Sequence, residues 1–138
     1  MDCVVRWTGG MTFLAETASN HVVVMDGAPE GGGRNLAPRP MEMVLLGTGG
    51  CTAYDVVLIL KKSRQDVTAC EARLSSERAE VDPKVFTRIH IHFVVRGRGL
   101  KPNLVAQAIR LSHEKYCSAS IMLGKTAEIT TDFEVVEE

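Results

Sequence analysis

PMEMVLLGTGGCTAYDVV, residues 40–57, is the stretch that decides the fold of this chain. It predicts a long helix over residues 41–62, because it follows a proline directly and because Lys61, Lys62 and Arg64 provide the cations that suit a helix C-terminus. Apolar side chains recur around nearly the whole circumference, which is typical of a helix buried on all sides. We therefore expect this helix at the centre of the fold.

Three glycines in the middle of this helix require an explanation. Gly47, Gly49 and Gly50 immediately precede Cys51, and each glycine costs about 1 kcal/mol of helix stability relative to alanine. Glycine is tolerated where another backbone or a ligand comes close. We expect such an approach beside Cys51.

Strands are predicted on the N-terminal side of the helix. Residues 4–7 and 11–15 flank a Gly-Gly turn, and residues 21–25 form a third apolar run, so an antiparallel meander is the simplest arrangement. Residues 28–40 are rich in proline and glycine and predict an exposed, mobile loop. Such loops often contain functional residues.

The C-terminal side mixes strands and helices. Residues 67–77 and 85–95 predict a second hairpin, residues 102–111 and 115–123 two helices, and residues 127–136 a last strand. Because strands and helices occur in runs, the fold class is α+β. A sheet of about six strands covers only one side of a helix, so a second subunit is expected on the other side, in a homodimer.

Composition and charge limit the class of protein. The 138 residues suit one domain over residues 1–138, and the 45% hydrophobic and 24% charged content is that of a folded protein. A net charge of -1 favours neither nucleic acid nor an anionic membrane as a partner. The N-terminus is no signal peptide, and the apolar stretch over residues 43–60 is interrupted by glycines and Asp55, which argues against a membrane span. We expect a cytoplasmic protein.

Four cysteines, Cys3, Cys51, Cys70 and Cys117, are the candidate reactive groups. No CxxC pair and no spacing typical of a zinc site occurs, and structural disulfides are disfavoured in a reducing compartment. Single cysteines are more often small buried core residues. Alternatively, Cys51 and Cys117 are reactive thiols in helical contexts, with His113 on the helical face of Cys117 if that helix is continuous.

Charged and histidine side chains offer further candidates. Arg34 and Arg39 in the loop are either solubilising charges or cations that fold over a thiol and lower its pKa. Glu42 suits the helix dipole and is also placed to hold such an arginine. His90 and His92 alternate on one strand face, but without an evident third ligand they are expected to face solvent. We expect no metal and no cofactor.

Particular segments of this sequence resemble those of a known family. Residues 40–57, together with EKYCSASIML at residues 114–123, resemble the OsmC/Ohr family of osmotically inducible and organic hydroperoxide resistance proteins. SERAE at residues 76–80 and FTRIHIHFVV at residues 86–95 resemble its YhfA-like subgroup most closely. The resemblance implies antiparallel sheets wrapped around a long central helix in an intertwined homodimer.

The resemblance also implies a chemistry. Cys51 matches the peroxidatic cysteine that attacks an organic hydroperoxide, and Cys117 matches the resolving cysteine that closes a disulfide. Arg39 or Arg34 would activate Cys51, with Glu42 orienting the arginine. A dithiol reductant, which in this family is often a lipoylated protein, would complete the cycle.

The sequence departs from the family pattern at two places. The glutamate expected ten residues before the reactive cysteine is Met41 here, and Glu42 lies one position late, about 100° around the helix. The proline that usually follows the resolving cysteine is Ser118. An alternative function is therefore a non-catalytic dimer that binds a small lipophilic molecule or senses oxidants.

Overall fold

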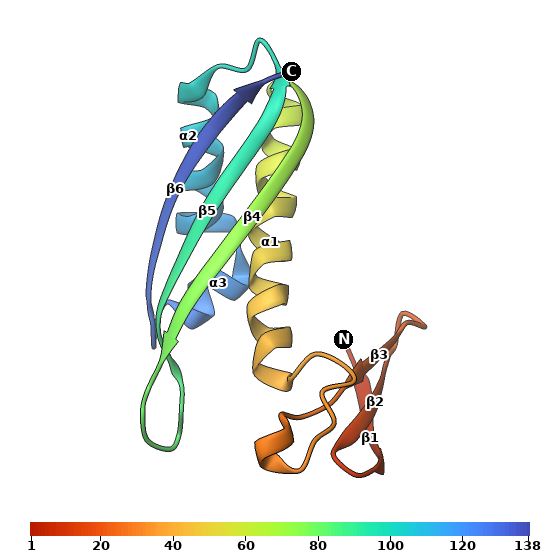
Figure 1. Cartoon of the computed structure of the whole chain (residues 1–138). Helices are drawn as coiled ribbons and strands as arrows, with labels where there is room; N and C mark the ends of the chain where they lie inside the picture. Colours follow the sequence, from red (N-terminus) through yellow and green to blue (C-terminus); the bar gives the residue numbers. More distant parts are fainter. The chain divides into compact units, whose positions relative to one another are not determined.

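The computed structural model describes all residues, 1–138, and the chain divides into two compact units, residues 1–46 and 47–138. Figure 1 shows the elements of both. The expectation of one domain stays a prediction, and each unit is described by itself.

The first unit contains a three-stranded antiparallel sheet. The strands β1 (Cys3–Gly9), β2 (Thr12–Thr17) and β3 (Val22–Met25) pair in the order β1-β2-β3. The predicted meander is therefore confirmed. Its first turn contains Gly9 and Gly10, both with positive φ, a conformation that glycine adopts without a steric penalty.

The segment after β3 is exposed but organised by a buried carboxylate. Asp26 accepts hydrogen bonds from the backbone N–H groups of Gly27 at 2.8 Å and Leu36 at 3.1 Å, so it holds both ends of the loop. These bonds hold the pKa of Asp26 below its ordinary value, with a smaller contribution from the positive charge of Arg34. A short 3-10 helix, η1 (Pro29–Gly31), was not foreseen from the sequence.

The helix α1 (Pro40–Lys62) matches the predicted helix 41–62 within one residue at its start. It begins in the first unit and continues through the second. By length and composition alone it could cross a membrane, with a mean hydropathy of 1.7 over its most apolar window, so the glycines and Asp55 do not disqualify it by that measure. The core helix of an α+β fold passes the same test, and such weak evidence defines no clear membrane span.

The second unit contains a three-stranded sheet made of β4 (Asp66–Arg78), β5 (Phe86–Arg98) and β6 (Glu128–Glu137). The strands β4 and β5 form the predicted antiparallel hairpin, whereas β6 pairs with β5 in parallel. The expectation of purely antiparallel sheets, and of one sheet of about six strands, is therefore wrong. Because helices connect β5 to β6, the chain returns to the same end of the sheet and enters β6 in the direction of β5.

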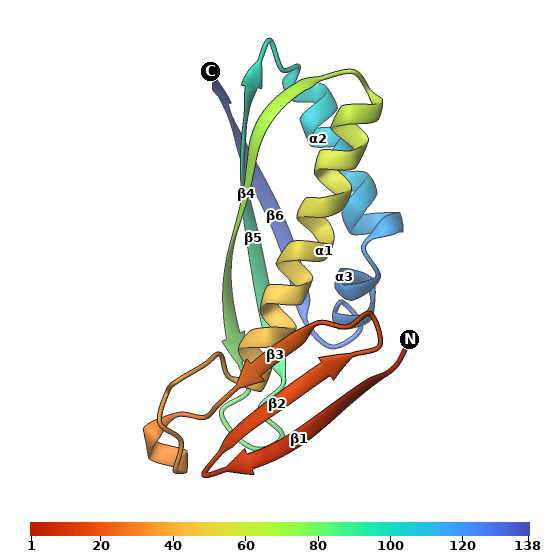
Figure 2. The same ribbon diagram turned by 90° about the vertical axis from the view of Figure 1, so that its right-hand side faces the viewer.

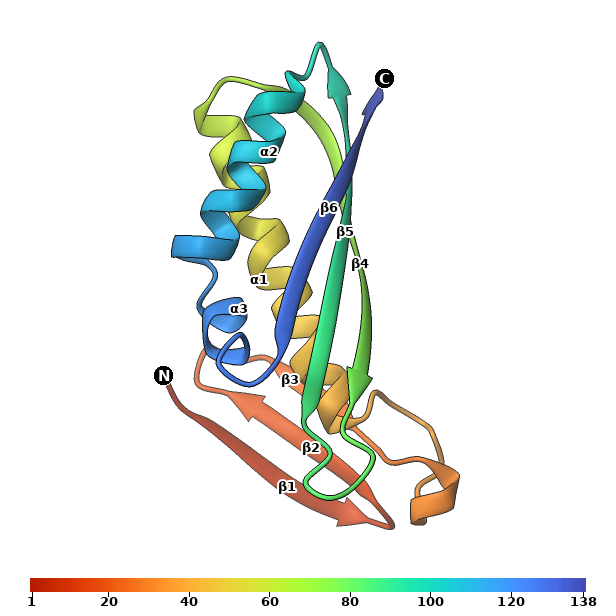
Figure 3. The same cartoon turned by 90° about the vertical axis from the view of Figure 1, so that its left-hand side faces the viewer.

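Helices cover one face of this sheet. Figures 2 and 3 show α1 and α2 (Pro102–Leu111) side by side on the same face of β4–β6, followed by α3 (Ser118–Leu123). The inward positions of β5 are buried as the alternation predicted: Ile89, Ile91, Phe93 and Val95. They pack in a core that also holds Val56 and Leu60 of α1, both with no exposed surface.

The helix α1 is not buried on all sides in a single chain. Within the second unit its buried residues share one face, whereas Tyr54 is 71% exposed and Leu58 is 40% exposed on another. The expectation of burial all round is therefore wrong for one chain. The reason is that the three-stranded sheet lies against one side of the helix only.

The three glycines of α1 have different surroundings. A Cβ atom on Gly49 would lie 2.7 Å from Cδ1 of Leu74 on β4, so the end of that side chain would have to shift. Nothing lies within 4 Å of the Cβ positions of Gly47 and Gly50. The expected close approach is thus found at Gly49 alone, and its partner is a side chain.

Candidate active site

Cys51 lies on α1, half-buried, in the second unit. Asp55 follows it by four residues, and residues four apart share one face of a helix. The helix therefore presents a thiol and a carboxylate on the same face.

Cys117 lies where the chain leaves one helix and starts another. The α2 helix continues into a π-helical turn, η2 (Ser112–Tyr116), and the N–H of Cys117 donates to the carbonyl of Ser112 at 2.8 Å. At Cys117 the backbone becomes extended, with ψ 100, and the next residue begins α3. The predicted helix 115–123 is therefore shorter, and His113 shares no continuous helical face with Cys117.

Cys117 caps the N-terminus of α3 with its sulfur. The Sγ atom accepts hydrogen bonds from the N–H of Ser120 at 3.4 Å and from its hydroxyl at 3.1 Å. The side chain is fully buried. Burial raises the pKa of Cys117, the bonds from Ser120 oppose this, and the neighbouring Cys51 raises the pKa further.

The fold brings the two predicted cysteines together. The sulfurs of Cys51 and Cys117 and a carboxylate oxygen of Asp55 all lie within 4.8 Å of one another. They come from α1 and from the start of α3, which are far apart in the sequence. A disulfide between them would require the two sulfurs to approach to about 2.0 Å.

Buried hydroxyl groups support the carboxylate. Ser112 donates to Oδ2 of Asp55 at 3.0 Å, and the hydroxyls of Ser112 and Thr52 lie 2.8 Å apart. Since an ionised carboxylate only accepts, Ser112 is the donor to Asp55, and Thr52 is then the donor to Ser112. No Lys, Arg or His forms an ion pair with Asp55.

Sequence reasoning missed Asp55, Ser112 and Ser120 as site residues. Asp55 was detectable, because its spacing from Cys51 places both on one helical face. Ser112 was not, because its contact with Asp55 joins residues 57 apart in the sequence, and local periodicity predicts no such contact.

The predicted activating residues lie in the first unit. The backbone N–H of Arg39 donates to Oε1 of Glu42 at 2.9 Å. This is the contact by which a glutamate at the third helical position caps a helix start. The side chains of Arg39 and Arg34 form no salt bridge, so the structure gives Glu42 a capping role, and the activating role of Arg39 or Arg34 stays a prediction.

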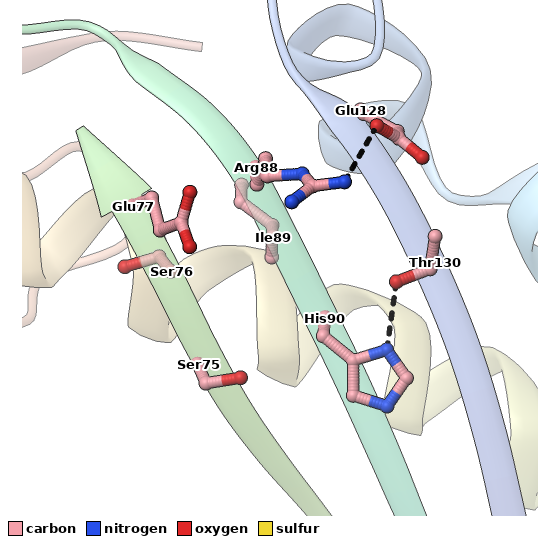
Figure 4. A pocket seen from close by; sticks show the side chains of 8 residues that line it. All are labelled: Ser75, Ser76, Glu77, Arg88, Ile89, His90, Glu128 and Thr130. Carbon is pink, nitrogen blue, oxygen red and sulfur yellow. Dashed lines mark hydrogen bonds and ion pairs between the residues drawn. The ribbon is translucent and has the colours of Figure 1, made fainter. Parts of the chain in front are cut away.

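His90 and His92 lie on the outer face of the second sheet with Asp132. Nε2 of His90 and Nδ1 of His92 both lie within hydrogen-bond distance of Oδ1 of Asp132, at 2.8 and 2.7 Å. Figure 4 shows His90 turned toward Thr130 in a shallow pocket of about 320 Å³. These contacts lower the pKa of Asp132, the bond from His92 most. The pair therefore forms a surface network.

A cavity of about 390 Å³ with both apolar and polar lining residues, Lys62 and Ser63 among the latter, opens beside Asp55. Leu58, Ile59 and Leu111 line it together with the ring of Tyr116. Its size is within the range of small-molecule sites. It offers an approach to the carboxylate that lies beside the two thiols.

Comparison with known proteins identifies the relatives of the chain. The sequence profile of the family described as OsmC-like protein matches residues 31–132. Protein YhfA of Escherichia coli K12 is 53% identical over 136 residues, covering 99% of this chain and 98% of the relative. The match with the Escherichia coli protein therefore extends well beyond the sequence segments that carry the resemblance.

Solved structures agree in fold. A hypothetical protein from Aquifex aeolicus VF5 is 30% identical, with a TM-score of 0.87, over 99% of this chain and 96% of that one. An organic hydroperoxide resistance protein OsmC from Legionella pneumophila is 15% identical, with a TM-score of 0.71, over 98% of both chains. The α+β fold class is confirmed.

Proposed function

Because this chain belongs to the OsmC-like protein family, we propose that it reduces organic hydroperoxides with Cys51 as the peroxidatic and Cys117 as the resolving cysteine. The observation that supports this most is the approach of the two sulfurs, within 4.8 Å, from separate helices of one unit. The Legionella pneumophila protein of similar fold is named an organic hydroperoxide resistance protein, which is consistent with this proposal.

The proposed reaction has two steps. The thiolate of Cys51 attacks the terminal oxygen of the hydroperoxide, the O–O bond breaks, and an alcohol leaves after taking a proton, with Cys51 oxidised to a sulfenic acid. The sulfur of Cys117 then attacks the sulfenic sulfur, water leaves, and the disulfide forms. A dithiol, for which a lipoylated protein is the proposed source, exchanges with the disulfide and restores both thiols.

The unequal burial of the two sulfurs supports different roles for them. Cys117 is fully buried and its pKa is raised, so we expect it to remain a thiol until Cys51 is oxidised. Cys51 is only half-buried. The more accessible sulfur is the one that meets the substrate. An arginine of the loop, Arg39 or Arg34, is the proposed activator of Cys51 in the assembled cytoplasmic homodimer.

The first test is the reaction of reduced, chelator-treated protein with cumene hydroperoxide and with hydrogen peroxide. We expect rapid loss of both thiols as a Cys51–Cys117 disulfide identified by mass spectrometry, faster with the organic peroxide. Cys51→Ser should abolish the reaction, and Cys70→Ser, which changes a half-buried cysteine elsewhere in the unit, should leave it unchanged. Oxidation no faster than that of free cysteine would exclude the proposal.

A second candidate function is non-catalytic binding of a small lipophilic molecule. It is favoured by the cavity of about 390 Å³ lined by Leu58, Ile59, Leu111 and Tyr116. It is favoured also by Glu42, whose carboxylate is engaged in capping α1. Slow peroxide chemistry together with saturable binding of a fluorescent fatty acid would support this alternative.

A further inference from the structure

Three side chains of the site form a set of metal ligands. Two sulfurs and one carboxylate oxygen, from Cys51, Cys117 and Asp55, lie within 4.8 Å of one another. Thiolate and carboxylate are ligands that zinc accepts in proteins. We propose that the reduced site binds one zinc ion through these three residues, and that the bound ion blocks the peroxide reaction; the second half rests on the proposed function, the zinc site does not.

The charges at the site favour a cation. Asp55 and two thiols that ionise are three acidic groups, and no salt bridge compensates the carboxylate. Lys62 lines the neighbouring cavity without pairing to Asp55. A divalent cation at this place would therefore meet a carboxylate and two sulfurs without having to displace an existing ion pair.

The geometry needs only small adjustments. A zinc ion with Zn–S bonds of about 2.3 Å holds two tetrahedral sulfurs roughly 3.8 Å apart. The present limit of 4.8 Å requires the ligand atoms to approach by no more than about 1 Å, which side-chain rotation provides. Cys51 and Asp55 are already aligned on one helical face.

Outer contacts orient two of the three ligands. Ser112 donates to Oδ2 of Asp55, which leaves the other carboxylate oxygen free to coordinate. Ser120 donates its N–H and hydroxyl to Sγ of Cys117, which holds that sulfur in place. Groups that hydrogen-bond to metal ligands in this way hold those ligands in the orientation that coordination needs.

The fourth position is open. The cavity of about 390 Å³ is lined by Asp55, so it gives water or another ligand a route toward the fourth position. Sites with three protein ligands and one exchangeable position are common for zinc. The ion would therefore exchange with the surroundings instead of being locked in the core.

Zinc and peroxide compete for the same electron pairs. Disulfide formation consumes both thiolates: two Cys–S⁻, one ROOH and two protons give Cys–S–S–Cys, ROH and water, with the peroxide reduced and the sulfurs oxidised. A disulfide retains neither thiolate, so the zinc ion leaves as the bond closes. A zinc-bound Cys51 is a weaker nucleophile, so the loaded protein reacts more slowly.

The test of binding uses the reduced, chelator-treated full chain titrated with Co²⁺, and then with Zn²⁺ in competition. We expect a thiolate-to-cobalt charge-transfer band that saturates at one ion per chain and is displaced by zinc. The band should disappear in Cys51→Ser and Cys117→Ser. Ser112→Ala should weaken binding roughly 10- to 100-fold, as the loss of an outer partner does.

Controls exclude other ligands. Cys70→Ser, and the double change of His90→Ala with His92→Ala, should leave the band and its affinity unchanged. Absence of the band in the wild-type chain, or a band that persists in Cys51→Ser, would overturn the zinc site.

A second measurement separates the inference from the proposed function. The rate of thiol oxidation by cumene hydroperoxide is compared for metal-free and zinc-loaded protein. We expect a slower reaction with zinc, because the thiolate is the nucleophile and the bound ion occupies its electron pair. A metal-free protein that does not react refutes the peroxidase while the cobalt band still supports the site. If the cobalt band is present but zinc does not change the rate of thiol oxidation in a reactive protein, the proposed inhibition by zinc is refuted.

Discussion

Ser120 determines how the sulfur of Cys117 is held. Its hydroxyl lies 3.1 Å from Sγ of Cys117, inside a buried environment that otherwise raises the pKa of that thiol. A hydrogen bond of this kind contributes about 1 kcal/mol. The buried position of Cys117 therefore depends on a polar neighbour three residues along the chain.

Replacing Ser120 by alanine should delay resolution. The remaining backbone N–H bond is the longer one, at 3.4 Å, so the pKa of Cys117 should rise further. We expect the Cys51 sulfenic acid to persist after a peroxide pulse, measured by its trapping with dimedone. Ser118→Ala, at an exposed neighbour, is the control. Trapping equal to that of the wild type would contradict this role.

Asp26 should make stability depend on pH. Its pKa in the folded chain is lowered, so its contribution is complete above the ordinary pKa of aspartate and is lost as the pH falls through the folded value. Asp26→Asn should therefore lower the melting temperature near pH 7, with the difference shrinking in acid. Thermal unfolding across pH measures this. A difference independent of pH would show that the carboxylate charge is not involved.

Two glycines, one in β5 and one in α1, lie beside close neighbours of different kinds. In β5, a Cβ on Gly97 would lie 2.2 Å from the backbone oxygen of Asp66, which cannot move without breaking the β4–β5 pairing. In α1, a Cβ on Gly49 would meet only the end of the Leu74 side chain, which can rotate. An added Cβ atom is therefore tolerated less well at Gly97, beside the backbone, than at Gly49, beside a side-chain end.

Alanine at these two positions should separate the effects. Gly97→Ala should lower the free energy of unfolding by about 1–3 kcal/mol or more, as overpacking does. Gly49→Ala should cost less, because improved helix propensity of about 1 kcal/mol offsets part of the strain. Urea unfolding measures both. Equal losses would show that Leu74 is as immobile as the backbone of Asp66.

The whole molecule is expected to work as a homodimer. In one chain the α1 helix exposes Tyr54 and Leu58, which lie beside each other on a face that no element of the second unit covers. Apolar surface of this kind on a core helix is stabilised when a second subunit buries it.

Tyr54→Glu should separate the subunits. A buried charge without a partner costs several kcal/mol, so we expect the mass by light scattering to fall from twice 15.1 kDa to that value. Gln107→Glu, on the exposed surface of α2, is the matched control. A wild-type chain that is already monomeric would contradict the dimer.

Local patterns made much of the fold predictable. The bounds of α1, the first meander, the hairpin of β4 and β5 and the inward face of β5 all follow from periodicity and turn residues, which depend on neighbours in the sequence. Cys51 and Cys117 were predictable as a pair only through the family resemblance. Their separation in the sequence does not tell whether the two side chains meet in the folded chain.

The sequence by itself determined the helix, most strands, the α+β class and the identity of the two candidate thiols. Only the tertiary structure decided that β6 runs parallel to β5, and that Asp55, Ser112 and Ser120 surround the sulfurs. The physical reason is that periodicity records which way each side chain faces within its own element. Which elements then meet is decided by long-range packing, and here a π-helical turn brings Cys117 to α1.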